Sequence, residues 1–166
     1  MSKPLVGIVL GSESDLPDIK DMLETLTEFG ITYEFNIISA HRTPEKAHDY
    51  SANAQKNGLE VIIACAGGAA HLAGVMASLT PLPVIGVPMH TDSLGGLDSL
   101  LSTVQMPAGI PVATVAIGKA GAKNAAILAA QIIGVKDSAL REKIKQFKIQ
   151  LAKKVEEKNA NLKIEK

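Results

Sequence analysis

The sequence contains one cysteine, no tryptophan and few other aromatic residues. A single cysteine excludes an internal disulfide framework and is typical of proteins from reducing compartments. Aromatic residues make up only 3% of the chain, which argues against the base-stacking surfaces that bind single-stranded nucleic acid. The first residues also lack the charged stretch and long apolar segment of a signal peptide, so we expect a cytoplasmic protein.

Neither sign of charge dominates, because 17 Lys and Arg residues balance 17 Asp and Glu residues. The whole molecule therefore creates no field that would draw it to nucleic acid or to a membrane surface. No apolar run is long enough to span a bilayer, and the run at residues 61–70 is interrupted by Gly67 and Gly68. We expect neither nucleic acid nor a membrane as a partner, and any bound anion must be held by local groups.

Signatures of metal sites and of serine hydrolases are also missing. No two of the four histidines have the spacing of metal ligands on one helix, and one cysteine cannot build a metal site. The GxSxG sequence of serine hydrolases is absent. We therefore expect no metal, and we interpret Cys65, at the end of an apolar run, as a small buried residue rather than a nucleophile.

What the chain does contain is an alternation of short apolar runs and longer helical periods, the pattern of repeated βαβ units around a parallel sheet. Its 166 residues, 46% of them hydrophobic, fit one domain spanning residues 1–166. Strands are expected near residues 5–10, 32–37, 59–65, 83–87 and 112–116. Helices are expected near residues 15–29, 43–57, 67–78, 97–104, 118–133 and 137–158.

Two of these elements have patterns that say more about their surroundings. In the second strand, Tyr33, Phe35 and Ile37 alternate with polar residues, which favours an exposed position at the edge of the sheet. In the last helix, apolar residues recur at a spacing of three or four and form one stripe. That stripe would pack either on its own domain or on a neighbouring subunit. It consists of Leu140, Ile144, Phe147, Leu151 and Val155.

The turn after the first strand has the groups that a phosphate needs. Gly11 gives a flexible backbone, Ser12 and Ser14 offer hydroxyl donors, and the following helix presents the positive end of its dipole. Asp15 could cap that helix or accept two hydrogen bonds from a ribose diol. The alternative is structural, because serines and an aspartate at a helix start also satisfy free backbone groups.

The turn after the second strand, residues 39–44, holds an imidazole and a fixed cation. Imidazoles exchange protons near neutral pH, so His41 is a candidate general acid and base. The forked guanidinium of Arg42 suits a phosphate, and its place at a helix start, where the dipole disfavours a cation, suggests an anionic ligand. A histidine bonded to backbone and a surface arginine are the structural alternatives. Because both turns follow parallel strands, we expect them to meet at one crevice.

A third candidate segment, residues 67–72, follows the third strand. His71 stands there among glycine and alanine, where little else needs an imidazole, although it could also be an ordinary histidine at a helix start. His90, in the loop at residues 89–96, keeps no assigned role.

Four ordered motifs resemble the PurE family, the N5-carboxyaminoimidazole ribonucleotide mutases of de novo purine synthesis. They are GSESD at 11–15, SAHRTP at 39–44, GGAAHL at 67–72 and the segment 97–107, which begins LDSL and ends QMP. The resemblance implies a flavodoxin-like three-layer α/β/α sandwich with a parallel five-stranded sheet and an extended C-terminal helix. It also implies a homo-octamer with this helix on a neighbour, sites between subunits, and no metal or organic cofactor.

The resemblance further implies a reaction. The carboxyl group of the substrate would leave the exocyclic nitrogen as CO2 and add to C4 of the imidazole, which gives 4-carboxyaminoimidazole ribonucleotide. His41 would act as general acid and base, and Asp15 would contact the ribose. The phosphate would be held by Ser14, Ser39 and Arg42. The full set of expected substrate-binding residues is Ser12, Ser14, Asp15, Ser39, Arg42, Gly67, Gly68, Ala69, Ala70, His71 and Leu72.

The sequence departs from the family pattern in two places. Ala73 stands where the family more often has proline, and residues 89–92 match no family pattern. Arg42, in place of the lysine typical of the branch that uses free CO2, favours the mutase. A direct aminoimidazole ribonucleotide carboxylase on the same fold is the nearer alternative. A noncatalytic nucleotide-binding module is the more distant one, because this fold class hosts many functions.

Overall fold

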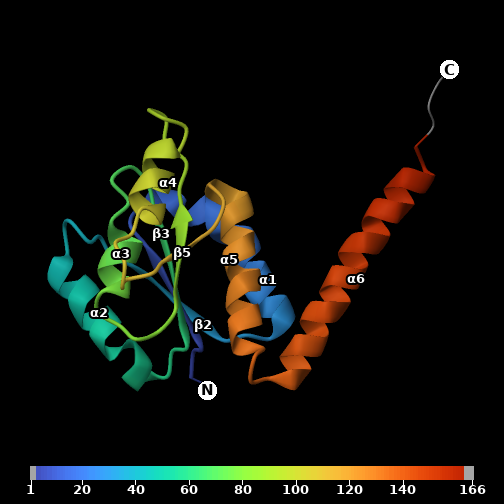
Figure 1. Ribbon diagram of the computed structural model, residues 1–166, viewed down its shortest axis with the longest axis horizontal. Helices are drawn as coiled ribbons and strands as arrows, with labels where there is room; N and C mark the ends of the chain where they lie inside the picture. Colours follow the sequence, from blue (N-terminus) through green and yellow to red (C-terminus); the bar gives the residue numbers. More distant parts are fainter. Residues whose placement is uncertain (1–2, 163–166) are drawn as a thin grey trace.

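The computed structural model describes residues 3–162, which form a parallel sheet between two layers of helices (Figure 1). This confirms the predicted flavodoxin-like α/β fold. The predicted domain span also included residues 1–2 and 163–166, which lie outside the described residues. In spatial order β2-β1-β3-β4-β5, the strands are β1 (Val6–Leu10), β2 (Tyr33–Ile37), β3 (Val61–Ala66), β4 (Val84–Pro88) and β5 (Ala113–Thr114).

Helices cover both faces of the sheet, with α1 and α5 on one side and α2 and α3 on the other (Figure 1). None of the helices in the described part of the chain combines the length and the apolar character needed to cross a membrane. Residues 3–162 contain a 3-10 helix, η1 (Glu13–Ile19), and the α-helices α1 (Lys20–Phe29), α2 (Pro44–Asn57), α3 (Leu72–Ala77), α4 (Leu97–Val104), α5 (Gly118–Ile133) and α6 (Ser138–Ala160).

The burial of each strand follows from its place in the sheet. Every residue of β1, β3 and β4 is buried, because helices cover both faces of these central strands. The predicted edge position of β2 is confirmed, and Phe35 and Ile37 are half-exposed there. The other edge strand, β5, is shorter than predicted. Pro111 cannot donate a ladder hydrogen bond before it, and the chain enters α5 soon after it.

The first helical segment begins differently from the prediction of one helix over residues 15–29. It starts as the 3-10 helix η1, because Pro17 has no N–H to donate into an α-helical turn. Its N-cap is Ser12 rather than Asp15, since the Ser12 Oγ accepts a hydrogen bond from the Ser14 N–H. The carboxyl group of Asp15 is therefore not needed to cap the helix.

The predicted helix over residues 67–78 also starts later than expected, at Leu72. Residues 67–71 form a loop in which Gly68 has a φ of +65°, in the left-handed region that favours glycine. The segment that the sequence singled out is therefore a glycine-rich loop between β3 and α3.

The order of the strands creates a crevice at one edge of the sheet. β1 pairs with β2 on one side and with β3 on the other, so the chain leaves β1 and β3 toward opposite sides. Such a switch point opens a gap at the carboxyl ends of the strands. The turns after β1, β2 and β3 all lie at this edge.

The last helix, α6, leans away from the sheet and extends beyond α5 (Figure 1). Its first half packs on the domain: Leu140 and Ile144 are buried, and the ring of Phe147 meets that of Phe29 at a centroid distance of 5.5 Å. In its second half the apolar side chains of the predicted stripe are exposed to solvent: Leu151 is 47% exposed and Val155 is 67% exposed.

Candidate active site

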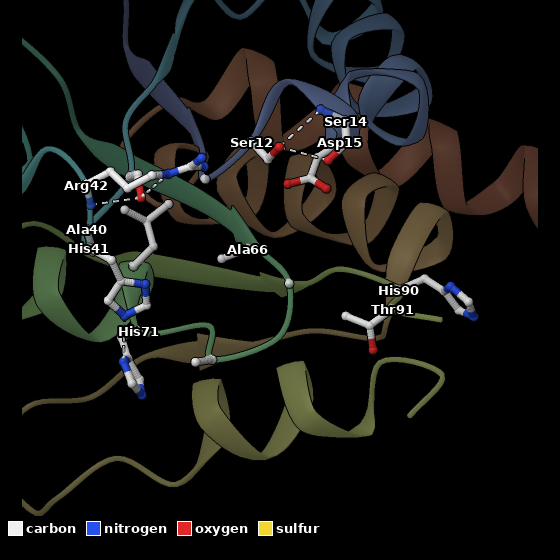
Figure 2. Close-up of a pocket in the computed structure, with 15 residues that line it drawn as sticks. Ser12, Ser14, Asp15, Ala40, His41, Arg42, Ala66, His71, His90 and Thr91 are labelled. Atoms are coloured by element: carbon white, nitrogen blue, oxygen red, sulfur yellow. Dashed lines mark hydrogen bonds between the residues drawn. The ribbon is translucent and has the colours of Figure 1, made fainter. Parts of the chain in front are cut away.

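A cavity of about 550 Å³ opens at the carboxyl ends of β1 and β3, where the crevice was expected (Figure 2). Its walls come from the turns after β1, β2, β3 and β4. All the predicted site residues line this cavity except Gly68 and Ala70. The complete lining consists of Gly11, Ser12, Ser14, Asp15, Ser39, Ala40, His41, Arg42, Ala66, Gly67, Ala69, His71, Leu72, His90 and Thr91.

Gly68 and Ala70 are the two residues that the structure places elsewhere. The Gly68 N–H donates a hydrogen bond of 2.9 Å to the Oγ of Ser99, which lies on α4. Ala70 is buried and belongs to the core between the sheet and α2 and α3. Because alternate groups of a tight loop turn to opposite sides, Gly67 and Ala69 line the cavity while their neighbours hold the loop to the protein.

Two histidines from different loops meet at the cavity. The Nε2 of His41 lies 3.0 Å from the Nδ1 of His71, and the rings are edge to face with centroids 5.1 Å apart (Figure 2). A hydrogen bond between imidazoles requires a proton on one of the two nitrogens and a lone pair on the other. The pair can therefore share one proton, and the Nδ1 of His41 is left for another partner.

The turn that carries Arg42 is fixed by its own side chains. The Thr43 hydroxyl donates to the Ser39 carbonyl at 2.9 Å and accepts from the Ser39 N–H at 3.0 Å, so it closes the turn and does not cap α2. The Ser39 Oγ accepts from the N–H of Arg42 at 3.2 Å and from its Nε at 3.5 Å. Ser39 therefore orients the guanidinium of Arg42.

The charge of Arg42 is not neutralised within the described part of the chain. None of the ion pairs among residues 3–162 includes this guanidinium. It also lies beside the N-terminus of α2, where the helix dipole disfavours a cation. An anion bound in the cavity would relieve both effects.

The opposite wall is formed by the turn after β1. The Ser14 hydroxyl donates to the Ser12 Oγ at 2.9 Å, and the Ser14 N–H donates to the same oxygen at 3.3 Å. The hydroxyl proton of Ser12 remains available to a ligand. Burial raises the pKa of the Asp15 carboxyl, and the nearby Asp18 carboxylate raises it further. Hydrogen-bond donors on a ligand would favour the ionised form of Asp15.

His90 and Thr91 are cavity residues to which the sequence assigned no role. They follow β4 and lie across the cavity from His41 and His71 (Figure 2). Their position at the carboxyl end of a predicted parallel strand could have indicated them, because every turn at that edge borders the same crevice.

Cys65 is a small buried residue, as the sequence predicted. Cys65 is fully buried, and burial strongly raises the pKa of its thiol. It is part of the apolar core and does not line the cavity. Among residues 3–162, no three His, Cys, Asp or Glu side chains are grouped so that they could hold a metal ion.

Comparisons with a family model, with curated proteins and with solved structures all indicate the same family. The AIR carboxylase family model matches residues 5–154. The N5-carboxyaminoimidazole ribonucleotide mutase of Pyrococcus horikoshii is 59% identical over 96% of this chain and 89% of the relative, and that of Thermotoga maritima is 57% identical over 96% and 92%. The crystal structure of Treponema denticola PurE superposes with a TM-score of 0.86 at 31% identity and covers 97% of this chain and 99% of that one. The chain therefore belongs to the AIR carboxylase family.

Proposed function

We propose that this chain is a mutase that converts N5-carboxyaminoimidazole ribonucleotide to 4-carboxyaminoimidazole ribonucleotide in purine biosynthesis. The observation that carries this proposal is the similarity to curated mutases, at 59% and 57% identity over 96% of the chain. A reaction of this kind moves a carboxyl group within one molecule, so the enzyme is an isomerase.

The cavity has groups for each part of such a ribonucleotide. Arg42, oriented by Ser39, supplies the phosphate with a cation that has no carboxylate partner among residues 3–162, and Ser14 adds a hydroxyl. Asp15 accepts hydrogen bonds from the ribose diol, and the free hydroxyl proton of Ser12 offers a further donor to the substrate. The polar groups of the two turns thus bind the nucleotide portion and leave the base near the histidines.

His41 carries the chemistry. It donates a proton to the exocyclic nitrogen of the substrate, the bond between that nitrogen and the carboxyl carbon breaks, and CO2 forms. C4 of the imidazole then bonds to the CO2 carbon, and the proton that C4 loses returns to His41. One proton is given and one is recovered, so the cycle needs no co-reactant. The Nδ1 of His71, 3.0 Å from the Nε2 of His41, is placed to stabilise the protonated ring.

The CO2 must stay in the cavity between the two steps. Ala66, Gly67 and Ala69 form part of the wall with small side chains or none, so they leave room for CO2 and offer it no reactive group. Gly67 and Ala69 are exposed in the free subunit, so substrate or a neighbouring subunit would have to exclude water from this wall, which limits loss of the intermediate. Leu72, at the start of α3, adds an apolar side chain to the same wall.

We further propose that the chain assembles as a homo-octamer in the cytoplasm, with substrate sites between subunits and with the second half of α6 on a neighbouring subunit. Leu151 and Val155 on α6, and Leu97 and Leu101 on α4, are about half-exposed or more, as apolar interface residues are in an isolated subunit. Sedimentation equilibrium tests the assembly: eight subunits are expected, and a monomer would contradict it. Neither nucleic acid, a membrane, a metal nor an organic cofactor takes part in the proposed reaction.

Parallel assays with two substrates test the reaction. Purified protein is expected to convert freshly prepared N5-carboxyaminoimidazole ribonucleotide without ATP or added metal, at a rate that a chelator does not change. Activity only with aminoimidazole ribonucleotide and high bicarbonate would identify a direct carboxylase instead. Binding of the nucleotide without turnover of either substrate would point to a noncatalytic module.

A further inference from the structure

The helix α4 lies beside the cavity but does not line it. It carries the first part of the motif at residues 97–107, and the proposed reaction assigns no role to this motif. Two of its polar side chains are nevertheless almost completely buried: Ser99 is 0% exposed and Thr103 is 2% exposed. Buried hydroxyls normally have a hydrogen-bonding task, so their partners indicate what α4 does.

The partners lie in the loop between β3 and α3. The Ser99 Oγ accepts a hydrogen bond of 2.9 Å from the Gly68 N–H. The Ser102 Oγ donates to the Gly68 carbonyl at 3.3 Å, besides a closer bond of 2.7 Å to the Asp98 carbonyl within its own helix. The Gly68 N–H is therefore bound by a hydroxyl of α4, whereas the Gly68 carbonyl accepts from the Ala70 N–H at 2.8 Å and only a longer contact from Ser102.

A third hydroxyl acts further along the same loop. The Thr103 Oγ1 lies 3.5 Å from the Ala70 carbonyl and 2.7 Å from the Ser99 carbonyl. The hydrogen bond from Gly68 to Ser99 is the shortest of the contacts between α4 and the loop. Ser99 is therefore the residue on which the position of the loop depends most.

The same helix also holds a second wall of the cavity. The Thr91 hydroxyl donates to the Asp98 Oδ1 at 2.8 Å, and its oxygen accepts from the Gly96 N–H at 3.2 Å. A Cβ added to Gly67 would lie 3.5 Å from the Thr91 Cγ2, so Thr91 packs directly against the loop. Figure 2 shows Thr91 beside this part of the cavity. One helix thus fixes two adjoining walls.

We propose that Ser99 is a positioning residue that keeps the loop at residues 67–70 closed over the CO2 formed during the reaction. This rests on the proposed function. Ser102 adds a weaker contact to the same loop. A glycine-rich loop is intrinsically free to move, and Gly68 already has a backbone conformation that few other residues adopt. CO2 is small and uncharged, so it is retained by a closed wall rather than by an ionic contact. Ser99 provides the closure without touching the substrate.

Hydrogen–deuterium exchange tests the first part of this proposal without any substrate. Ser99→Ala removes the acceptor of the Gly68 N–H, so exchange in peptides covering residues 67–71 should become faster by about tenfold. Ser51→Ala is the matched control, because Ser51 is also 0% exposed and its hydroxyl donates to the Ala47 carbonyl within α2, away from the cavity. Equal exchange of the loop in wild type and Ser99→Ala would overturn the proposal.

Retention of labelled carbon tests the second part. The substrate carries ¹³C in its carboxyl group, the medium contains unlabelled bicarbonate with carbonic anhydrase, and mass spectrometry measures ¹³C in the product. Wild type and Ser51→Ala should keep the label. Ser99→Ala should lose label and release aminoimidazole ribonucleotide, with a lower kcat for product and little change in KM. Ser102→Ala, at a partly exposed site, is expected to show a smaller loss and replaces Ser99→Ala if the latter does not fold.

The outcomes separate this proposal from the one on which it rests. A wild-type enzyme that does not convert the substrate, or that converts it with complete loss of label, contradicts the proposed mutase function and leaves the exchange result to decide whether Ser99 holds the loop. A wild-type enzyme that retains the label, together with folded Ser99→Ala and Ser102→Ala that retain it equally well, contradicts the role of α4 alone.

Discussion

The turns after β1 and β2 are built alike but carry opposite charges. Each begins just after a parallel strand with a serine whose Oγ accepts hydrogen bonds from a residue two or three positions later: Ser12 from Ser14, and Ser39 from Arg42. The first turn continues to the acidic Asp15, and the second presents Arg42 beside His41. The same local scaffold therefore presents an acceptor on one side of the cavity and a cation on the other.

Two turns of opposite charge allow the cavity to distinguish the parts of a nucleotide. A phosphate needs a cation, whereas a ribose diol needs an acceptor of hydrogen bonds. Arg42 could not serve as the acceptor for a ribose diol, and Asp15 could not serve as the cation for a phosphate. The serine hydroxyls that both turns offer do not change this. If the comparison is correct, substitutions in the two turns should damage different steps of the reaction.

The largest effect is expected from the second turn. His41→Asn removes the general acid and base but keeps a polar side chain of similar reach, so kcat should fall by about 10²- to 10⁴-fold. Nucleotide affinity, measured by calorimetry, should change little. Turnover at the wild-type rate would remove His41 from the mechanism and would leave the second turn with a binding role only.

A smaller effect, on binding, is expected from the same turn. Arg42→Ala removes a charge-assisted contact to the phosphate, so the Kd of the nucleotide should rise by roughly tenfold to a hundredfold. Arg42→Lys is the matched comparison, because it keeps the charge but loses the forked guanidinium. Its Kd for the nucleotide should lie between those of wild type and Arg42→Ala. Equal affinity in wild type and Arg42→Ala would show that the phosphate is bound elsewhere.

The first turn should respond more weakly. Asp15→Asn keeps one carbonyl acceptor but loses the charge that strengthens a contact to the ribose, so affinity should fall by about tenfold or less. A deoxyribose analogue without the 2′ hydroxyl should bind to wild type and to Asp15→Asn with similar affinity. A loss of affinity for the ribose compound in Arg42→Ala, together with no loss in Asp15→Asn, would contradict the proposed division of roles.

The smallest effect concerns the stability of the free protein. Because burial and Asp18 raise the pKa of Asp15 above its ordinary value of 3.8, the folded state binds the proton of this carboxyl more tightly than the unfolded state does. Ionisation of Asp15 therefore lowers stability as the pH rises above 3.8 through the raised pKa. Asp15→Asn should have a slightly higher Tm than wild type at neutral pH and no advantage below 3.8. Thermal unfolding at several pH values measures this difference, and a constant difference at all pH values would contradict it.

Most of the fold could be predicted because it depends on patterns that are local in the chain. The runs that became β1, β3 and β4 are apolar throughout, and burial on both faces requires this. The starts of η1 and α3 were less predictable. Pro17 favours a 3-10 turn, and the left-handed conformation of Gly68 keeps residues 67–71 outside the helix. The hydrogen bond from the Gly68 N–H to Ser99 of α4 also holds this loop, and no local pattern shows it.

The candidate site was predictable in part for a similar reason. Ser12, Asp15, His41 and Arg42 stand in turns after strands, and the parallel sheet brings such turns together. The place of Thr91 in the cavity could have been expected from its position after β4. The outward turn of Gly68 was not predictable, because it depends on a contact with Ser99 of α4, 31 positions away. Family resemblance indicated the segment but not the direction in which each residue of the loop points.

The apolar positions, the turns and the charge that each turn carries can all be read along the chain, because these properties belong to single residues and their near neighbours. The 3.0 Å contact between the Nε2 of His41 and the Nδ1 of His71, and the hydrogen bond that joins Ser99 to the loop of Gly68, arise only when the chain is folded. These contacts join residues about thirty positions apart, 30 for the histidines and 31 for Ser99 and Gly68. Such distances are set by how the helices pack on the sheet, and no stretch of sequence contains them.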